Sequence, residues 1–336
     1  MSRCKLFLLA LLILGSGGSL LATFIVSGDC WYTTYDEKGV GQRRTTKAFT
    51  ITVDGCRWRI RTAQSGANGS GWGTSACLYM EAANSVDSLF VTRVYDTSKR
   101  EPSNPPIMPR SVTVTSGKTP CVDPDQFTAA IWFPYLSNCE LKTATNGRVK
   151  YFFAMNDSMV RDDITFPFTA RSVSNSSPPL LQELLLHNEG FESIPKIDGT
   201  LEKRPLKPPF TNGYTQISFC VLDFTNVAKL SLPRHSQIKY FRPASGATTN
   251  SEILPRGQID ILAQSITITN ASLPPPEWVA PPTIIYDKRL PPMGDEDFWY
   301  FSKGFIYETN SPEVMRVLQQ YEDRQDQIRK NTERLP

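Results

Sequence analysis

The stretch that decides the fold is residues 47–62, KAFTITVDGCRWRIRT. Its apolar residues occupy odd positions before the middle and even positions after it, namely Phe49, Ile51 and Val53, then Cys56, Trp58 and Ile60. One continuous strand would place the two sets on opposite faces, because side chains alternate along a strand. Asp54-Gly55 lies between the two sets and is a favoured two-residue hairpin turn.

A hairpin with Asp54-Gly55 at its tip pairs Val53 with Cys56, Ile51 with Trp58 and Phe49 with Ile60. All six side chains then share one face, and Thr50 and Thr52 lie opposite Arg59 and Arg57 on the wetter face. One strand with a bulge at Gly55 would restore the same face by inserting a residue. Either arrangement predicts amphipathic antiparallel β-structure that begins the folded domain.

Length and charge limit the possible domain organisation and function of the chain. At 336 residues the chain can bury the core of one large β-rich domain or of two smaller ones. The balance of 36 basic and 33 acidic residues, a net charge of +3, is too even for a nucleic-acid binder. Since His187 and His235 are the only histidines, metal binding and general-base catalysis have few candidates.

The N-terminus carries an export pattern. Arg3 and Lys5 precede an uninterrupted apolar run at 6–14, a glycine cluster at 15–18 and a second apolar run at 20–26. Two interpretations stay open. A signal peptide could be cleaved after Gly17 or after Gly28, or residues 6–26 could remain as a membrane-anchoring helix. We favour cleavage, and a lipid-attachment site is disfavoured because Asp29 directly precedes Cys30.

The chain has seven cysteines, of which Cys4 belongs to the export segment. The remaining six are Cys30, Cys56, Cys77, Cys121, Cys139 and Cys220. An exported protein meets an oxidising compartment, so one to three disulfides are one interpretation, and small buried thiols are the other. A zinc site is disfavoured by the absence of a Cys-x-x-Cys spacing.

Beyond the hairpin, the pattern is mostly that of strands. They are predicted at 77–81, 87–96, 111–116, 148–154, 164–173, 214–224, 227–232, 237–242, 258–264, 265–270 and 283–286. The clearest predicted helix is 178–188, with Ser177 as its cap and His187 near its C-terminal dipole. An ambiguous segment at 123–141 permits a helix that Pro134 would end or kink, and 298–307 permits a hairpin. Ser311 and Pro312 open a last helix whose first half is apolar on one face and whose second half is charged.

The matches to known catalytic motifs in this sequence are weak. Ser236-x-x-Lys239 matches a motif of penicillin-recognising enzymes, but that chemistry needs a helix, and this segment is predicted as a strand. No Gly-x-Ser-x-Gly elbow is present. The acidic groups at 123/125, 162–163 and 295–297 match no calcium loop and are typical of solvated turns. Paired carboxylates of a hydrolase are defined in space, so the sequence selects none.

Three motifs, together with the export segment, resemble the layout of uncharacterised exported bacterial proteins. They are the 49–62 pattern, residues 131–139 (IWFPYLSNC) and residues 286–290 (YDKRL). The sheet-rich pattern with a covering helix is also similar to the lipoprotein-carrier half-barrels, which bind acyl chains on a concave apolar face. This resemblance implies a fold and a class of ligand, and it brings no catalytic residues.

We therefore predict a mainly β fold, β-rich α+β, with a large twisted antiparallel sheet or half-barrel and one or two packed helices. The expected organisation is an export signal or anchor at 1–28, one β-rich domain at 29–310 and a helix with a charged tail at 311–336. The expected function is non-enzymatic binding of a protein partner or an apolar ligand in the bacterial envelope, without cofactor or nucleic acid. An envelope hydrolase using unidentified carboxylates is the alternative. The candidate contacts are aromatic: Trp58, Tyr95, Trp132, Phe298, Trp299 and Tyr300.

Overall fold

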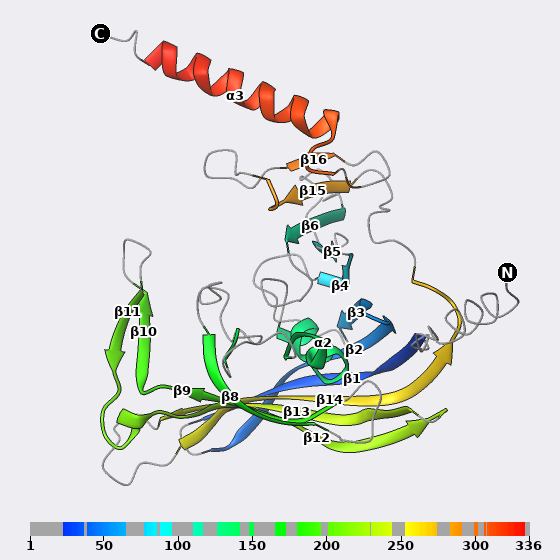
Figure 1. The fold of residues 1–336 in the computed structure, drawn as a ribbon, viewed down its shortest axis with the longest axis vertical. Coiled ribbons are helices and arrows are strands. Elements are labelled where there is room, and N and C mark those ends of the chain that lie inside the picture. The colour runs from blue at the N-terminus through cyan, green and yellow to red at the C-terminus, as the bar shows by residue number, and fades with distance from the viewer. Residues whose placement is uncertain are drawn as a thin grey trace, which may run out of the picture.

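In the computed structural model, one curved sheet of 14 strands dominates the chain (Figure 1). The structure describes residues 23–36, 39–64, 77–85, 88–95, 110–116, 126–141, 148–150, 165–172, 180–195, 201–228, 230–243, 253–273, 283–290, 299–301, 306 and 308–332. The predicted β-rich fold with a large sheet and few helices is thereby confirmed.

From one edge of the sheet to the other, the strands are β16 (Trp299–Phe301), β15 (Thr283–Asp287), β6 (Arg110–Ser116), β5 (Ser88–Tyr95), β4 (Cys77–Asn84), β3 (Arg57–Gln64), β2 (Gly41–Asp54), β1 (Thr23–Tyr35), β14 (Ile253–Thr269), β13 (Leu230–Pro243), β12 (Tyr214–Val227), β9 (Leu181–Asn188), β8 (Thr165–Ser172) and β7 (Arg148–Lys150). Neighbouring strands are antiparallel except β6 and β15, which are parallel. The sheet is therefore mixed, with a single parallel pair.

Three further elements lie outside this order. β10 (Phe191–Pro195) and β11 (Leu201–Pro205) form a separate antiparallel pair, which stands out from one end of the large sheet in Figure 1. The helices α2 (Gln126–Leu141) and α3 (Pro312–Thr332) lie on the sheet and at its far end. Neither helix is long and apolar enough to cross a bilayer.

Helix α2 lies in the inner bend of the sheet (Figure 1). Residues 127–136 are all buried, so the helix contacts protein on every side. It packs on β2, β3, β9, β13 and β14. We call the face that it covers the concave face and the resulting cluster the α2 core. The cluster includes Val26, Ile51, Trp58, Ile60, Leu184, Phe219, Ile238 and Ile261 from the sheet, and Phe127, Ala130, Ile131, Phe133 and Leu136 from the helix.

A second cluster lies on the opposite face near the β16 edge. We call it the α3 core: Phe90, Val112, Val114, Ile285, Leu290, Tyr300, Ile306 and Val314. Phe90 belongs to this cluster, whereas its strand neighbour Val91 belongs to the α2 core. Because successive side chains of a strand point to opposite faces, the two cores lie on opposite sides of one sheet.

The predicted hairpin at 47–62 is confirmed, but its register differs from the predicted one. Asp54 pairs with Arg57 and Val53 with Trp58, so Gly55 and Cys56 form the turn. Gly55 has a φ of 63°, which glycine adopts without strain. Cys56 is exposed rather than part of the apolar face, and the buried Thr62 takes the place opposite Phe49. Thr52 consequently faces Arg59, and Thr50 faces Arg61.

The shift has a cause outside the hairpin. The buried side chain of Asn84 accepts a hydrogen bond from the Trp58 amide at 2.7 Å. Its own amide nitrogen donates to the Cys56 carbonyl oxygen at 2.9 Å. Both registers keep the same side chains inward because they differ by two positions, so alternation alone cannot distinguish them. The contact from β4 therefore holds the turn at 55–56.

Two further predictions are wrong. The folded chain does not begin at the hairpin, because β1 precedes it and pairs with both β2 and β14. Residues 181–188 form strand β9 rather than a helix, paired between β8 and β12. Leu184 and Leu186 are buried while Leu185 between them is half-buried, which is strand alternation. Pairing on both sides satisfies the backbone and overrides the helical propensity of a short leucine run.

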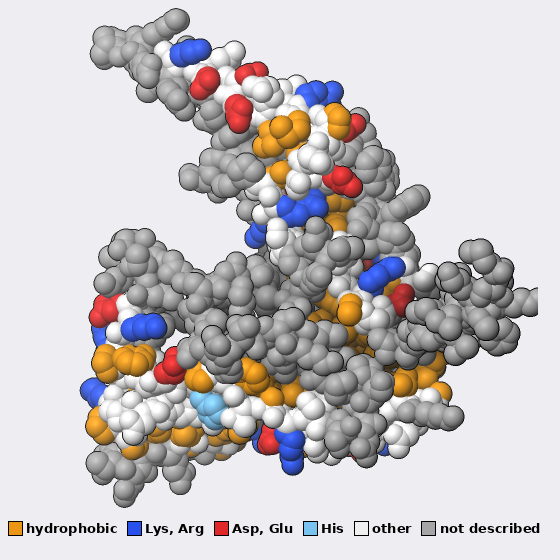
Figure 2. Space-filling model, viewed as in Figure 1, with side chains coloured by type: hydrophobic (Ala, Val, Ile, Leu, Met, Phe, Trp, Pro, Cys, Tyr) orange, Lys and Arg blue, Asp and Glu red, His pale blue; other side chains and the backbone are white. Residues whose placement is uncertain are grey.

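Other predictions hold. Helix α2 forms within 123–141, although it continues through Pro134. The Ser311 hydroxyl accepts a hydrogen bond from the Val314 amide at 3.3 Å and caps α3 as predicted. Val314 is buried, whereas Met315 is 53% exposed. Figure 2 shows side chains of both charges along the outer half of α3. The predicted hairpin at 298–307 stays a prediction, because β16 pairs with β15 and the turn at 302–304 lies outside the described residues.

The close approach of Gly213 to Asn188, at the base of the β10–β11 pair, can be tested by substitution. Gly213 has a φ of 84°, and a Cβ added there would overlap the carbonyl oxygen of Asn188. Gly55 also has a positive φ, but an added Cβ would meet nothing within 4 Å. We expect Gly213→Ala to lower the free energy of unfolding by roughly 3 kcal/mol or more, against about 1–2 kcal/mol for Gly55→Ala. Chemical denaturation of both variants measures this, and equal losses would contradict the described packing.

Candidate functional site

The six predicted aromatic contacts do not form one site. Trp58 and Trp132 are each 2% exposed and both belong to the α2 core. Tyr300 is buried in the α3 core on the opposite face, and Trp299 beside it is 39% exposed. Tyr95 ends β5, but its side chain lies outside the described residues, as does Phe298. Among the four candidates whose side chains are described, Trp58 and Trp132 share one core.

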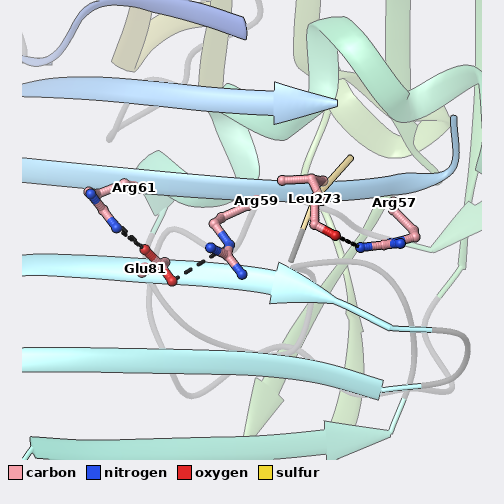
Figure 3. A network of polar contacts seen from close by, with 5 residues as sticks. All are labelled: Arg57, Arg59, Arg61, Glu81 and Leu273. Carbon is pink, nitrogen blue, oxygen red and sulfur yellow. Dashed lines mark hydrogen bonds and ion pairs between the residues drawn. The ribbon is translucent and has the colours of Figure 1, made fainter. Parts of the chain in front are cut away.

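The hairpin arginines lie on the other face of the sheet, which we call the convex face (Figure 3). Glu81 of β4 forms an ion pair with Arg61 at 2.5 Å and a second, longer one with Arg59 at 3.7 Å. Arg57 donates to the carbonyl oxygen of Leu273. These contacts tie β3 to β4 and to the segment after β14. Arg61 is 59% exposed and its pair with Glu81 contributes about 0–1 kcal/mol, whereas Arg59 at 23% exposed is largely covered.

A buried carboxylate lies at the middle of the convex face. Asp260 of β14 is 4% exposed. Its Oδ1 accepts a hydrogen bond from Gln237 Nε2 at 2.9 Å and lies 3.4 Å from His235 Nε2. Its Oδ2 accepts from Gln258 Nε2 at 2.6 Å, and Tyr35 donates to Gln258 Oε1 at 2.9 Å. We call these five residues the Asp260 network.

The network belongs to a row of paired residues that crosses seven strands. The row runs Arg171, Glu183, Cys220, Gln237, Asp260, Trp31 and Thr46, from β8 to β2. The Trp31 ring centroid lies 6.4 Å from that of His235, and the Arg43 guanidinium lies 4.6 Å from the Trp31 centroid. Trp31 therefore has a polar ring and a cation as neighbours. The convex face is thus polar in the strands where the concave face is apolar.

The chemistry open to the described carboxylates follows from their partners. Asp260 is surrounded by donors that use most of its acceptor sites. The other buried carboxylate, Asp287, is fully buried and accepts two bonds from the Arg289 guanidinium, at 2.8 and 2.7 Å. The carboxylates of Asp260 and Asp287 therefore each accept hydrogen bonds from neighbouring amide or guanidinium groups. The arrangement stabilises the sheet and the turn after β15 more readily than it transfers protons.

The side chains of three cysteines are described, and they are present as thiols rather than in disulfides: Cys30, Cys56 and Cys220. Burial raises the pKa of the Cys220 thiol, and the Glu183 and Asp260 carboxylates raise it further against the opposing effect of Lys239. A nucleophilic cysteine needs the reverse, a lowered pKa. The Cys220 position therefore disfavours thiol catalysis.

The remaining candidate residues have structural contacts. His187 lies on β9, where Nε2 is 3.1 Å from the Thr169 hydroxyl and Nδ1 is 3.4 Å from the Thr215 hydroxyl, so its predicted role at a helix end is wrong. Ser236 and Lys239 lie on strand β13, three positions apart, and so point to opposite faces. This confirms the interpretation that the Ser-x-x-Lys match is not a catalytic pair.

The Asp260 network was missed because it carries no motif. Its residues come from three strands, and they meet only through sheet pairing. The available signal was a polar residue at every second position, at 235, 237 and 239 and again at 258 and 260. Among the described residues, no group of three or more His, Cys, Asp or Glu side chains could hold a metal ion. Comparison with models of known protein families and with curated proteins gives no match for this chain.

Replacing Asp260 tests whether the network stabilises the sheet. Asp260→Leu keeps the approximate size of the side chain but leaves the Gln237 and Gln258 amides without their acceptor. We expect the free energy of unfolding to fall by about 1–3 kcal/mol. The control is Asp223→Leu, whose side chain is 53% exposed and 3.6 Å from Arg234. Because that pair is exposed, we expect a loss below about 1 kcal/mol. Equal losses in denaturant titrations would contradict the assignment.

Thiol reactivity tests the environment of Cys220. Since its pKa is raised, less thiolate is present at pH 8 than for an ordinary thiol, and alkylation should be slow. Cys56 lies exposed in the hairpin turn and should be modified first. Timed iodoacetamide labelling with peptide-level mass spectrometry separates the two sites. Faster labelling at Cys220 than at Cys56 would show that the described environment is wrong.

Proposed function

We propose that this protein is an exported bacterial envelope protein that binds an apolar ligand between α2 and the concave face of the sheet. One observation supports the proposal above the others. Helix α2 is buried from residue 127 to residue 136. The apolar face beneath it is formed by β2 and β3 together with β9, β13 and β14. An acyl chain or similar molecule needs such a surface, because removal of apolar area from water is the main favourable term in its binding.

The described contacts between α2 and the sheet are mostly apolar, so they resemble the contacts that an apolar ligand would make. Phe133 packs edge-on against Phe219 of β12, with centroids 4.9 Å apart. The Tyr135 hydroxyl donates to the Pro233 carbonyl oxygen at 3.1 Å, and burial raises the Tyr135 pKa well above its usual value. Near its start, Phe127 lies 4.9 Å from the Lys47 ammonium. Most of the described packing is non-directional, which is the kind of contact that an apolar ligand also makes.

The aromatic content of the α2 core is consistent with this class of ligand. Trp58 and Trp132 fall within this core, so the two sequence-predicted contacts that come together do so where the ligand would lie. The convex face supplies the solvated surface that an exported protein needs. The hydrolase alternative gains no support from Asp260 and Asp287, since each is engaged by neighbouring donors.

Binding of a dansyl-labelled long-chain fatty acid tests the proposal. We expect saturable binding to the purified mature protein, with energy transfer from tryptophan to the dansyl group. Trp132→Phe should lower this transfer, because Trp132 belongs to the α2 core. Trp299→Phe, on β16 and partly exposed, is the matched control and should leave the transfer nearly unchanged. A folded protein that shows no saturable binding would refute the proposal.

A change in the shape of the core tests where the ligand lies. Phe219→Leu removes the ring that meets Phe133 and should alter the dissociation constant roughly threefold to tenfold, up to about 1.4 kcal/mol. Leu222→Ala, on the same strand and 53% exposed, should leave it unchanged. Circular dichroism of both variants checks that they are folded. Equal affinities for Phe219→Leu and the unaltered protein would place the ligand elsewhere.

A further inference from the structure

Strand β1 limits where an export protease can cut this chain. It lies in the interior of the sheet, with β14 on one side and β2 on the other. Its first six residues are already in register: Thr23 pairs with Thr269, and each residue to Gly28 has a partner on β14. From Phe24 onward, each also has a partner on β2. The first half of β1 therefore completes the hydrogen bonding of two neighbouring strands.

Two of the same six residues, Phe24 and Val26, also contribute to the core. Val26 has no exposed surface and belongs to the α2 core. The Phe24 ring lies 6.1 Å from that of Tyr135 in α2. At Gly28, an added Cβ would overlap the Leu262 carbonyl oxygen, so the backbones approach closely there. Removal of residues 23–28 would expose this part of the core and unpair the ends of β2 and β14.

Cleavage after Gly28, one of the two positions that the sequence permits, is incompatible with this arrangement. The mature chain would begin at Asp29, halfway along β1. A membrane-anchoring helix over residues 6–26 conflicts with β1 as well, because residues 23–26 are strand. The 17 residues at 6–22 remain for a helix, which is the lower limit of roughly 17–25 for a span, and they include the glycine cluster.

We propose that the precursor is cleaved at the Gly17–Gly18 peptide bond. The inference rests on the proposed export of the protein. Gly15 and Gly17 supply the small residues that export proteases require at the third and first positions before the cut. Water adds across the bond, so that Gly17 ends in a carboxylate and Gly18 begins with a free amine. Residues 18–22 then precede β1, and the whole strand is retained.

The test is the N-terminus of the full chain expressed in an exporting bacterium. Intact mass and N-terminal peptide mapping should give Gly18 as the first residue. Gly17→Phe should block the cut and cause the precursor to accumulate. Ser16→Phe is the matched control, since the position between the two small residues is tolerant, and it should be processed as before.

The outcomes separate the inference from the proposals on which it rests. An N-terminus at Asp29, or at any residue other than Gly18, overturns the inferred site while leaving export intact. An intact Met1 in the membrane fraction overturns cleavage itself. Ligand binding is measured independently with the dansyl probe, so its failure leaves the processing result unaffected.

Discussion

The fold depends on the pairing of β1 along both of its edges. The strands β2 to β6, with β15 and β16, lie on one side of it, and β14 to β12, with β9 to β7, lie on the other. In the described sheet, β1 is the strand that joins these two halves. Helix α2 reinforces the join, because it packs on β2 and β3 of one half and on β9, β13 and β14 of the other. The continuous apolar surface beneath α2 exists only when β1 is in place.

This join also explains why the two faces differ. Along β1, Val26 and Cys30 are buried on the concave face, whereas Asp29 and Trp31 face the polar side with Asp260 and its donors. A carboxylate buried without hydrogen bonds would cost several kcal/mol, and the two glutamines remove most of that cost. The polar network therefore lets a central, crowded position of the sheet hold an acidic side chain.

Local patterns in the sequence predicted the fold class well, because alternation and turn residues act over a few positions. They predicted most strands, the last helix and the hairpin at 47–62, and they permitted the helix within 123–141. They failed where contacts with neighbouring strands determine the register or the type of element. The hairpin register depends on Asn84 of β4, and the strand at 181–188 depends on β8 and β12. Strand β1 was hidden because its first residues are apolar on both faces and continue the export segment.

The candidate site was harder to predict than the fold for the same reason. Trp58 and Trp132 were chosen as large aromatic residues, and only the packing of α2 on β3 shows that they share one core. The Asp260 network combines residues 35, 235, 237, 258 and 260, which no local pattern connects. Its members become recognisable as a group only through the register of β1, β13 and β14.

The separation of β1 from β14 in sequence has a consequence for how this protein reaches its fold. Thr23 pairs with Thr269, so the join between the two halves closes only after most of the chain is available. Contacts this distant form slowly, because the entropy of loop closure must be overcome first. Until then one edge of β1 and the facing edge of β14 are open, whereas β1 and β2 are consecutive in the chain and can pair early. Under the export that we propose, β1 would cross the membrane first, and the sheet would be completed once residues 253–269 had followed.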